Sequence, residues 1–458
     1  MAEYTSTMER TIALLLKEKK YMTLRDILVT MNPSDVAALF EALPEDRLPL
    51  LFRLLPKEQA AETFVEMEPE AQQLLIHGFS DTELKEVVDE LYVDDAVDLI
   101  EEMPANVVKR ILSQADPEMR QSINEILRYA EDSAGSIMTT EYISLRPTMH
   151  VDEAITRIRR TGVDKETIYT CYVTRDRKLI GLVTVKDLLL CEDDDTVIED
   201  IMITNVIHVK TWDDKEKVAQ MLSKYNFLAL PVLDSEERMV GIVTFDDAMD
   251  VIEEEATEDI KKMAAIIPSE KSYMRMQPVE IFKKRVPWLT LLMISSTFTG
   301  LIISYFENQL YAMICLSSFI PMLMGSAGNA GSQTSVTIIR GLSLNEIKFA
   351  DLAKVIWKEI RVAVLCGLVL AAACFAKVML IDCLLLQTDG VTWVVALVVC
   401  LALAVTVLVS KIVGCVLPML ADKLGFDPAL MASPLITTVV DALSLLVYFN
   451  IARAILGL

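Results

Sequence analysis

The sequence has few of the residues that build zinc sites or disulfide frameworks. Its 458 residues hold only three histidines, which are scattered, and none of its eight cysteines forms a CxxC pair. Six of the cysteines lie in or beside apolar segments, where they are typical of small core residues rather than of disulfides. We therefore expect neither a disulfide framework nor a zinc or copper site.

The chain also lacks enzyme motifs and the features of a secretory signal. No nucleophile–base pair, phosphate-binding P-loop or redox motif is present, so we expect no enzymatic activity. The N-terminus MAEYTSTMERTIALLL has neither a basic start nor a small-residue cleavage site. We therefore expect the first half of the chain to stay in the cytosol.

The charge is distributed unevenly along the chain. The whole sequence carries 43 Lys and Arg against 66 Asp and Glu, a net charge of −23. Residues after 270 hold fourteen bases and ten acids, so they carry +4 and residues 1–270 carry −27. An acidic first half argues against nucleic acid or anionic lipid as its partner and is compatible with cation binding.

The second half contains five apolar runs, each long enough to cross about 30 Å of hydrocarbon as a helix. Bases precede the first run, separate the second from the third and the fourth from the fifth, whereas the other two connections hold only acids. This asymmetry predicts a multi-pass cell-membrane protein with a cytoplasmic N-terminus and an external C-terminus. The five runs are Trp288–Phe306, Leu310–Ile339, Ile360–Ile381, Val391–Leu420 and Ala429–Ile455.

The last run contains Asp441, a carboxylate inside an apolar segment. Such a charge costs about 2.5–3.5 kcal/mol near the centre of a bilayer, so it indicates a functional group. Pro434, Thr437 and Thr438 precede it and can supply oxygen atoms, which suit hard cations such as Mg²⁺ and Ca²⁺. The alternative is a single Asp hydrogen-bonded to a neighbouring helix.

The second run contains PMLMGSAGNAGSQTSV, in which glycines alternate with Ser and Ala. Small residues let helices approach closely, so Gly325, Gly328 and Gly331 predict a packing face. Asn329 and Gln333 lie among them and are candidates for an ion pathway. Because five spans form no simple inverted repeat, a pore most simply lies between two copies of the chain on a two-fold axis.

Two repeats organise the cytosolic half. Turn signals recur about every twelve residues between 30 and 120 and separate short segments with helical periodicity, which predicts an armadillo-like helical stack, with an irregular helical bundle as the alternative. Further on, GLVTVKDLL at 181–189 returns as GIVTFDDAM at 241–249, each after a strand–turn–strand pattern. These segments resemble a tandem pair of CBS domains over about residues 135–252.

The CBS resemblance implies candidate contacts to the ribose of ATP or another adenine nucleotide. The candidates are Thr184, Asp187, Thr244 and Asp247, a hydroxyl and a carboxylate at each strand-to-helix turn. The alternative is a CBS pair with an empty cleft. The following segment, Asp246–Ile266, is rich in acids and has a strong helical pattern, and its charges form either a solvated face or a link to the first span.

The domain order, together with PMLMGSAGNAGSQTS and SPLITTVVDALSLLVYF, resembles the MgtE family of magnesium channels over nearly the whole chain. The resemblance implies a homodimer in the lipid bilayer with one central Mg²⁺ pore. The carboxylate of Asp441 and the carbonyl of Thr437 would hold a largely hydrated ion. The implied pore residues are Asp441, Thr437, Asn329, Gly328 and Ser433.

The resemblance also implies a cytosolic Mg²⁺ sensor that closes the pore. Two positions depart from the family pattern: Asn226 replaces a sensing aspartate, and Ser433 stands where an Asn often precedes the proline. The first departure puts one sensor site in doubt, and the second affects pore hydration. The implied sensor acids are Asp94, Asp98, Glu216, Asp247, Asp250, Glu255, Glu258, Asp259 and Asp427.

The expected fold is multidomain, with an all-α superhelical N-domain, α/β tandem CBS domains and an all-α transmembrane domain of five helices. The boundaries are 1–130 for the helical domain, 131–245 for the CBS pair (about 135–198 and 199–252), 246–275 for the connecting plug helix and 276–458 for the membrane domain.

The expected function is Mg²⁺ uptake gated by cytosolic Mg²⁺. The alternatives are transport of another divalent cation such as Co²⁺, and a membrane signalling protein that senses nucleotide through its CBS pair. A CBS-bearing metal exporter is a nearer rival, but its CBS pair typically follows the membrane domain.

Overall fold

In a computed structural model of the chain, several short helices of the first 130 residues begin at a proline or next to one. Residues 2–269, 273, 276–307, 313–388, 390–431 and 433–457 are described. Proline suits the first helical turn because its missing N–H would have no partner there, as at Pro33, Pro69 and Pro117. The helices are α1 (Ala2–Lys17), α2 (Tyr21–Leu28), α3 (Pro33–Glu41), α4 (Leu48–Phe52), α5 (Lys57–Val65), α6 (Pro69–Gly78), α7 (Asp81–Val88), α8 (Val93–Glu102), α9 (Ala105–Gln114) and α10 (Pro117–Ile126), with a 3₁₀ turn at Glu45–Arg47.

Within this helical domain, helices pack against the next-but-one helix along the chain. The pairs α3–α5, α5–α7, α7–α9, α4–α6 and α8–α10 are in contact. This is the arrangement expected when short helices stack and bury one continuous apolar core, so the helical N-domain is confirmed.

The CBS region forms two sheets with the same topology. Each has a short strand parallel to the second strand, which pairs antiparallel with the third, and each has a register shift at the end of its second strand. The sheets comprise β1 (Ile143–Leu145), β2 (Thr170–Arg175) and β3 (Lys178–Thr184), then β4 (Val209–Lys210), β5 (Ala229–Leu233) and β6 (Met239–Thr244). The helices are α11 (Val151–Thr161), α12 (Val185–Leu190), α13 (Ile198–Ile201) and α14 (Lys215–Tyr225), with a 3₁₀ turn at Gly162–Asp164. The predicted duplication is confirmed.

The repeated glycine of each third strand has a steric reason. A Cβ atom on Gly181 would lie 2.6 Å from Met202 Sδ, and one on Gly241 would lie 2.6 Å from the carbonyl oxygen of Thr139. The two neighbouring segments, one in each repeat, cross the sheet so closely that only glycine fits.

The chain divides into two units, residues 1–253 and 254–458, and α15 (Phe245–Met263) continues from the first into the second. The expected connecting helix over 246–275 is therefore too long, because the helix ends at Met263 and residues 264–269 form a turn and irregular backbone. Residues 270–272, 274 and 275 of that expected helix lie outside the described residues.

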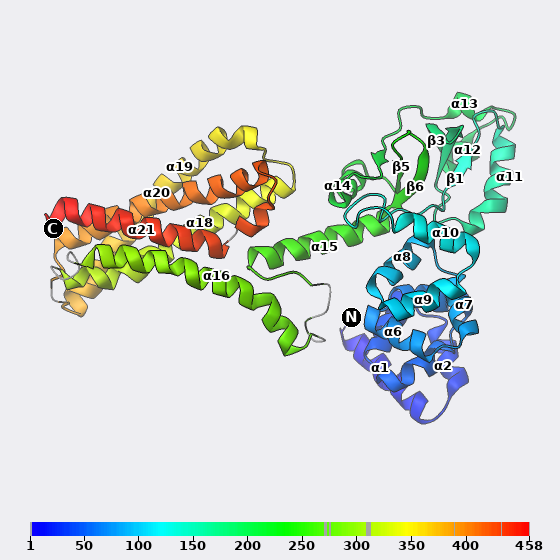
Figure 1. Cartoon of the computed structure of the whole chain (residues 1–458), viewed down its shortest axis with the longest axis horizontal. Helices are drawn as coiled ribbons and strands as arrows, with labels where there is room; N and C mark the ends of the chain where they lie inside the picture. The colour runs from blue at the N-terminus through cyan, green and yellow to red at the C-terminus, as the bar shows by residue number, and fades with distance from the viewer. Residues whose placement is uncertain are drawn as a thin grey trace. The chain divides into compact units, whose positions relative to one another are not determined.

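Within its described residues, the second unit contains five long helices. Helix α20 packs against α18, α19 and α21 (Figure 1). The helix α16 packs against α21. The long helices are α16 (Pro278–Tyr305), α18 (Ile320–Ser343), α19 (Leu352–Lys377), α20 (Trp393–Lys423) and α21 (Ser433–Leu456); the shorter ones are a π-helix at Val378–Leu385 and 3₁₀ turns at Ile314–Phe319, Phe349–Asp351 and Pro428–Met431.

The observed helices differ from the expected spans in several places, and the first long helix begins at Pro278 rather than at Trp288. Among the described residues, four helical segments are long and apolar enough to cross a membrane, and α18 is not one of them. Its run of Gly, Ser, Ala, Asn and Gln lowers its hydropathy; residues 310–312 of the expected second span lie outside the described residues. The third helix begins at Leu352 rather than at Ile360, so Glu359 lies within it.

We predict that Gly241→Ala destabilises the chain by about 1–3 kcal/mol, because the new methyl group must displace backbone at Thr139. The control is Gly300→Ala in α16, where an added Cβ would meet nothing within 4 Å. Thermal unfolding of the purified full-length protein should show a lower midpoint for Gly241→Ala only. Equal midpoints for the two variants would contradict the steric explanation.

Candidate ion-binding sites

The structure brings Asp441 of α21 next to Gly328 of α18. A Cβ atom on Gly328 would lie 3.1 Å from Thr437 Cγ2 and 3.9 Å from Asp441 Oδ1. Asp441 is half-buried within the chain. Three of the predicted pore residues, Asp441, Thr437 and Gly328, therefore line one contact between two helices.

Pro434 shapes the start of α21. Its carbonyl oxygen accepts hydrogen bonds from the hydroxyls of Thr437 and Thr438, both at 2.9 Å. Thr437 lies inside the continuous helix, so its own carbonyl keeps a second lone pair beyond the helical hydrogen bond. Ser433 is the first residue of α21, and its side chain lies outside the described part of the chain.

A polar stripe runs along the exposed face of α18. Asn329, Gln333 and Thr337 are exposed and spaced four residues apart, so they lie on one side of the helix. An amide side chain facing lipid would lose its hydrogen bonds with water. We therefore expect this face of α18 to contact water or another polar surface, which would satisfy the hydrogen-bonding groups of these side chains.

A second candidate site lies in the first unit, where several acids come close together. Three of them are the predicted sensor residues Asp94, Asp98 and Asp247. We call this group the acidic cluster; it comprises Asp94, Asp95 and Asp98 of α8, Asp246 and Asp247 of α15, and Glu141 and Glu166 from the first CBS domain.

Burial, together with repulsion between like charges, raises the pKa values of five carboxyls of the acidic cluster. Burial, and after it the charge of Asp247, raises the pKa of Asp94 well above its usual range and that of Asp95 to about 7. The same two causes raise the pKa of Asp98 to about 7, although this side chain still reaches solvent at the rim. Burial also raises the pKa of Glu166 to about 8 and that of Asp247 to about 6, the latter despite the hydrogen bond from Thr244.

Few hydrogen bonds compensate the charges of the acidic cluster. Asp94 is only 6% exposed and accepts a hydrogen bond from the backbone N–H of Asp95 at 3.1 Å. The Oε2 atom of Glu166 is buried and has no hydrogen-bond partner among the described residues. Buried carboxylates in this state favour a bound cation or a proton.

The remaining predicted sensor residues of the first unit are less closely grouped. Glu216 accepts a hydrogen bond from Gln220 at 3.1 Å, and Asp250 is exposed on α15. Asn226 ends α14 with a φ of 54°, a left-handed conformation that Asn tolerates, so this departure has a backbone role. Across the described residues, no three His, Cys, Asp or Glu side chains are yet arranged closely enough to hold one metal ion.

A third site joins the end of α15 to the loop before α21, both within the second unit. The ammonium of Lys262 lies 2.7 Å from Glu258 Oε1 and 2.7 Å from Asp427 Oδ2. Burial alone would lower the pKa of Lys262, but its hydrogen bonds with the two carboxylates raise it. Nearby, burial and then the charge of Asp427 raise the pKa of Asp259. The ammonium of Lys262 thus lies between two of the predicted sensor carboxylates, an ion pair that the sequence did not indicate.

Glu255, the remaining predicted acid of this helix, is half-buried one turn before Glu258 and Asp259.

The predicted nucleotide-binding residues cap helices. Thr184 Oγ1 donates to Asp187 Oδ2 at 2.6 Å and accepts from the N–H of Asp187 at 3.1 Å, which forms a reciprocal cap of α12. Thr244 Oγ1 donates to Asp247 Oδ2 at 2.5 Å in the second repeat. These hydrogen bonds give the Thr and Asp residues a structural role independent of any ligand.

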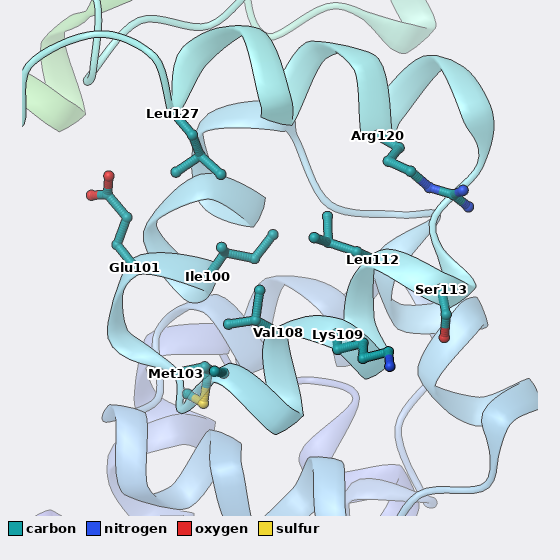
Figure 2. Close-up of a pocket in the computed structure, with 10 residues that line it drawn as sticks. Ile100, Glu101, Met103, Val108, Lys109, Leu112, Ser113, Arg120 and Leu127 are labelled. Carbon is teal, nitrogen blue, oxygen red and sulfur yellow. The ribbon is translucent and has the colours of Figure 1, made fainter.

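An apolar hollow of about 620 Å³ lies on the helical domain between α8, α9 and α10 (Figure 2). Ile100, Val108 and Leu112 face it, and Lys109 and Arg120 lie at its edge. Its apolar lining and its bases make it unsuited to a divalent cation, and none of the predicted site residues lines it.

The chain is similar to known families and proteins over nearly its whole length. Family models match the divalent cation transporter domain MgtE over residues 320–451, the MgtE intracellular N domain over residues 31–132, and CBS domains over residues 134–192 and 198–254. The magnesium transporter MgtE of Thermus thermophilus is 36% identical over 446 residues, or 96% of this chain and 97% of that protein. That of Bacillus subtilis is 32% identical over 97% of this chain and 96% of its own.

A solved structure of the cytosolic domain of the Mg²⁺ channel MgtE in complex with ATP is also similar. It has a TM-score of 0.51 and 35% identity, and the match covers 53% of this chain and 99% of that one. A structure of the soluble part of a magnesium transporter matches with a TM-score of 0.51 and 31% identity, over 55% of this chain and 99% of that one.

Helices long enough to span a bilayer, joined to a helical and CBS region, define a multi-pass membrane transporter. The chain belongs to the MgtE family of divalent cation transporters. Membership in a transporter family confirms the expectation that the chain is not an enzyme.

We predict that the acidic cluster destabilises the fold as the pH rises in the absence of divalent cations. A carboxyl whose pKa is higher in the folded chain binds protons more tightly there, so its contribution to stability is lost between its unfolded pKa, about 4, and its folded pKa of about 7–8. The double variant Asp95→Asn/Glu166→Gln should therefore gain stability relative to wild type as pH goes from 5 to 8.

Thermal unfolding of the full-length protein in a chelating buffer measures this difference. The control is Asp176→Asn, an exposed residue outside the cluster, for which the difference from wild type should stay constant. A pH-independent difference for the double variant would refute the assignment of the raised pKa values.

Proposed function

We propose that this chain is a Mg²⁺ channel or transporter that mediates magnesium uptake and is closed by cytosolic Mg²⁺. The observation that carries the transport proposal is the placement of Asp441 against Gly328 and Thr437, where α18 and α21 meet. Relatives at 36% and 32% identity over nearly the whole chain bear the name magnesium transporter, which supports Mg²⁺ as the ion.

The ion is held near Asp441 with most of its water. Mg²⁺ gives up its waters reluctantly, so a single carboxylate and a few neutral oxygens suit it better than a closed protein cage. Thr437 offers a carbonyl, and Asn329 offers an amide on the exposed stripe of α18. Gly328 leaves the space that a side chain would take from the ion and its waters.

Two copies of the chain complete the pathway. The stripe formed by Asn329, Gln333 and Thr337 needs a polar neighbour, and a two-fold axis beside α18 supplies the same stripe from a second copy. The soluble part lies in the cytoplasm and the C-terminus lies outside, as the distribution of bases around the spans favours.

Cytosolic Mg²⁺ closes the pathway by bridging carboxylates. The acidic cluster holds Asp94, Asp98 and Asp247 close together with raised pKa values, so their charges repel unless protons or cations compensate them. Asp250 and Glu216 of the CBS region add ligands, as do Glu255, Glu258, Asp259 and Asp427 near the end of α15. Binding to the closed arrangement in preference to the open one is all that gating requires.

The CBS pair also binds an adenine nucleotide in this proposal. The related cytosolic domain was solved in complex with ATP, and its match covers 53% of this chain and 99% of that domain. Thr184, Asp187 and Thr244 lie at the strand-to-helix turns of the two repeats.

We predict that Asp441→Ala lowers Mg²⁺ flux at least tenfold in proteoliposomes containing a Mg²⁺ indicator. The variant removes the carboxylate beside Gly328, whereas Asp441→Asn keeps an oxygen without the charge and should be intermediate. The control is Asp422→Asn at the exposed end of α20, which should transport normally. Near-normal flux through folded Asp441→Ala would contradict the pore assignment.

We predict that Lys262→Gln makes the end of α15 more dependent on Mg²⁺. Without the ammonium, Glu258 and Asp427 lose their shared cation, so this contact should loosen in Mg²⁺-free buffer and recover as Mg²⁺ replaces the lost charge. Limited proteolysis of the α15 region across a Mg²⁺ titration measures the effect.

The matched control for this test is Lys261→Gln, because Lys261 donates to the carbonyl of Ser269 rather than to a carboxylate. Cleavage of Lys262→Gln that does not respond to Mg²⁺ would refute a cation-bridged contact at Asp427.

A further inference from the structure

The second unit, residues 254–458, which contains the membrane helices, holds a buried charged group besides Asp441. Lys411 of α20 is 6% exposed, and its Nζ lies 3.0 Å from Thr334 Oγ1 of α18 and 3.4 Å from Glu359 Oε2 of α19. Thr334 in turn donates its hydroxyl hydrogen to Glu359 Oε2 at 3.0 Å. We call Lys411, Thr334 and Glu359 the buried triad; it joins three helices.

The buried triad lies well inside its helices. Lys411 is twelve residues from the end of α20, which is about 18 Å at 1.5 Å per residue. A lysine in such a position is costly without a partner, and Glu359, whose side chain is 15% exposed, is that partner. Lys411 and Glu359 therefore form an ion pair between helices that is largely shielded from solvent.

The triad is continuous with the helix contact that holds Asp441. Ser410, next to Lys411, donates a hydrogen bond to the carbonyl of Ala327, one residue before Gly328. Thr334 lies six residues beyond Gly328, about 9 Å along α18. The charge on Lys411 is thus within the range at which a cation beside Asp441 interacts with it through protein.

We propose that Glu359 is a specificity-determining residue of the ion pathway, because it cancels the charge of Lys411 and keeps the pathway beside α18 open to divalent cations. The inference rests on the proposed transport function. An uncompensated Lys411 repels an ion in proportion to the ion's charge, so the energy is twice as large for Mg²⁺ as for Na⁺. The fold-reduction for Mg²⁺ is then the square of that for Na⁺.

The test compares Mg²⁺ flux with Na⁺ flux in divalent-free solution for the purified full-length protein in proteoliposomes. Glu359→Gln should lower Mg²⁺ flux about tenfold and Na⁺ flux about threefold. Lys411→Met leaves Glu359 negative and should keep or raise the Mg²⁺-to-Na⁺ ratio. Glu359→Gln/Lys411→Met removes both charges, which buried ion pairs often tolerate, and should restore the ratio.

The matched control is Asp382→Asn, which breaks the 2.7 Å ion pair of Asp382 with Lys377 in the same membrane unit and should leave the ratio unchanged. A wild-type ratio in Glu359→Gln, or a double variant as impaired as Glu359→Gln, would overturn the inference, since either outcome means that the triad only packs helices. If Glu359→Gln does not fold, a lowered ratio in Lys411→Met overturns it instead. Absence of Mg²⁺ flux in wild type would refute the proposed function itself.

Discussion

The close approach of α18 to α20 and α21 is the constraint on which the membrane unit depends. A Cβ atom on Gly414 would lie 2.5 Å from the carbonyl oxygen of Gly331, and one on Gly331 would lie 2.6 Å from Ser410 Oγ. Without a hydrophobic driving force between helices in lipid, such contact relies on small residues and on hydrogen bonds between helices. The placement of Asp441 and of the buried triad both follow from this crossing.

The chain compensates its buried and partly buried acids in two different ways. Lysines compensate some of them, as Lys411 does for Glu359 and Lys262 does for Asp427. Others have no base beside them in the described structure, as in the acidic cluster around Asp94 and Asp247. A tethered ammonium fixes a contact permanently, whereas acids without a base leave the contact dependent on what the solution supplies. Contacts that contain a lysine are therefore held in any solution, whereas contacts between acids alone depend on the protons and cations that the solution supplies.

Local patterns predicted the repeats well, and contacts between distant segments were harder to predict. The repeated GLVT and GIVT segments indicated two equivalent β-units, and the apolar run around Asp441 indicated its helix, because both signals lie within a few residues. Lys411 and Glu359 lie 52 residues apart in the sequence, and they meet because α20 packs against α19. The sequence signal that could have indicated this ion pair is the single Lys within the apolar run VTVLVSKIVGCV. Glu166 and Glu141 lie in loops, whose positions periodicity does not predict.

In the proposed gate, the raised pKa values of the acidic cluster connect proton binding with cation binding. Carboxyls with pKa values of about 6–8 are partly protonated near neutral pH, so a divalent cation that binds among them must displace protons. When the pH falls, protons bind to these carboxylates and weaken cation binding. The same protons also reduce the repulsion between the carboxylates, as a bound cation would. In the proposed gate, protons and Mg²⁺ both favour the compact arrangement, because both reduce the repulsion between the same carboxylates. They compete with each other for binding to those carboxylates.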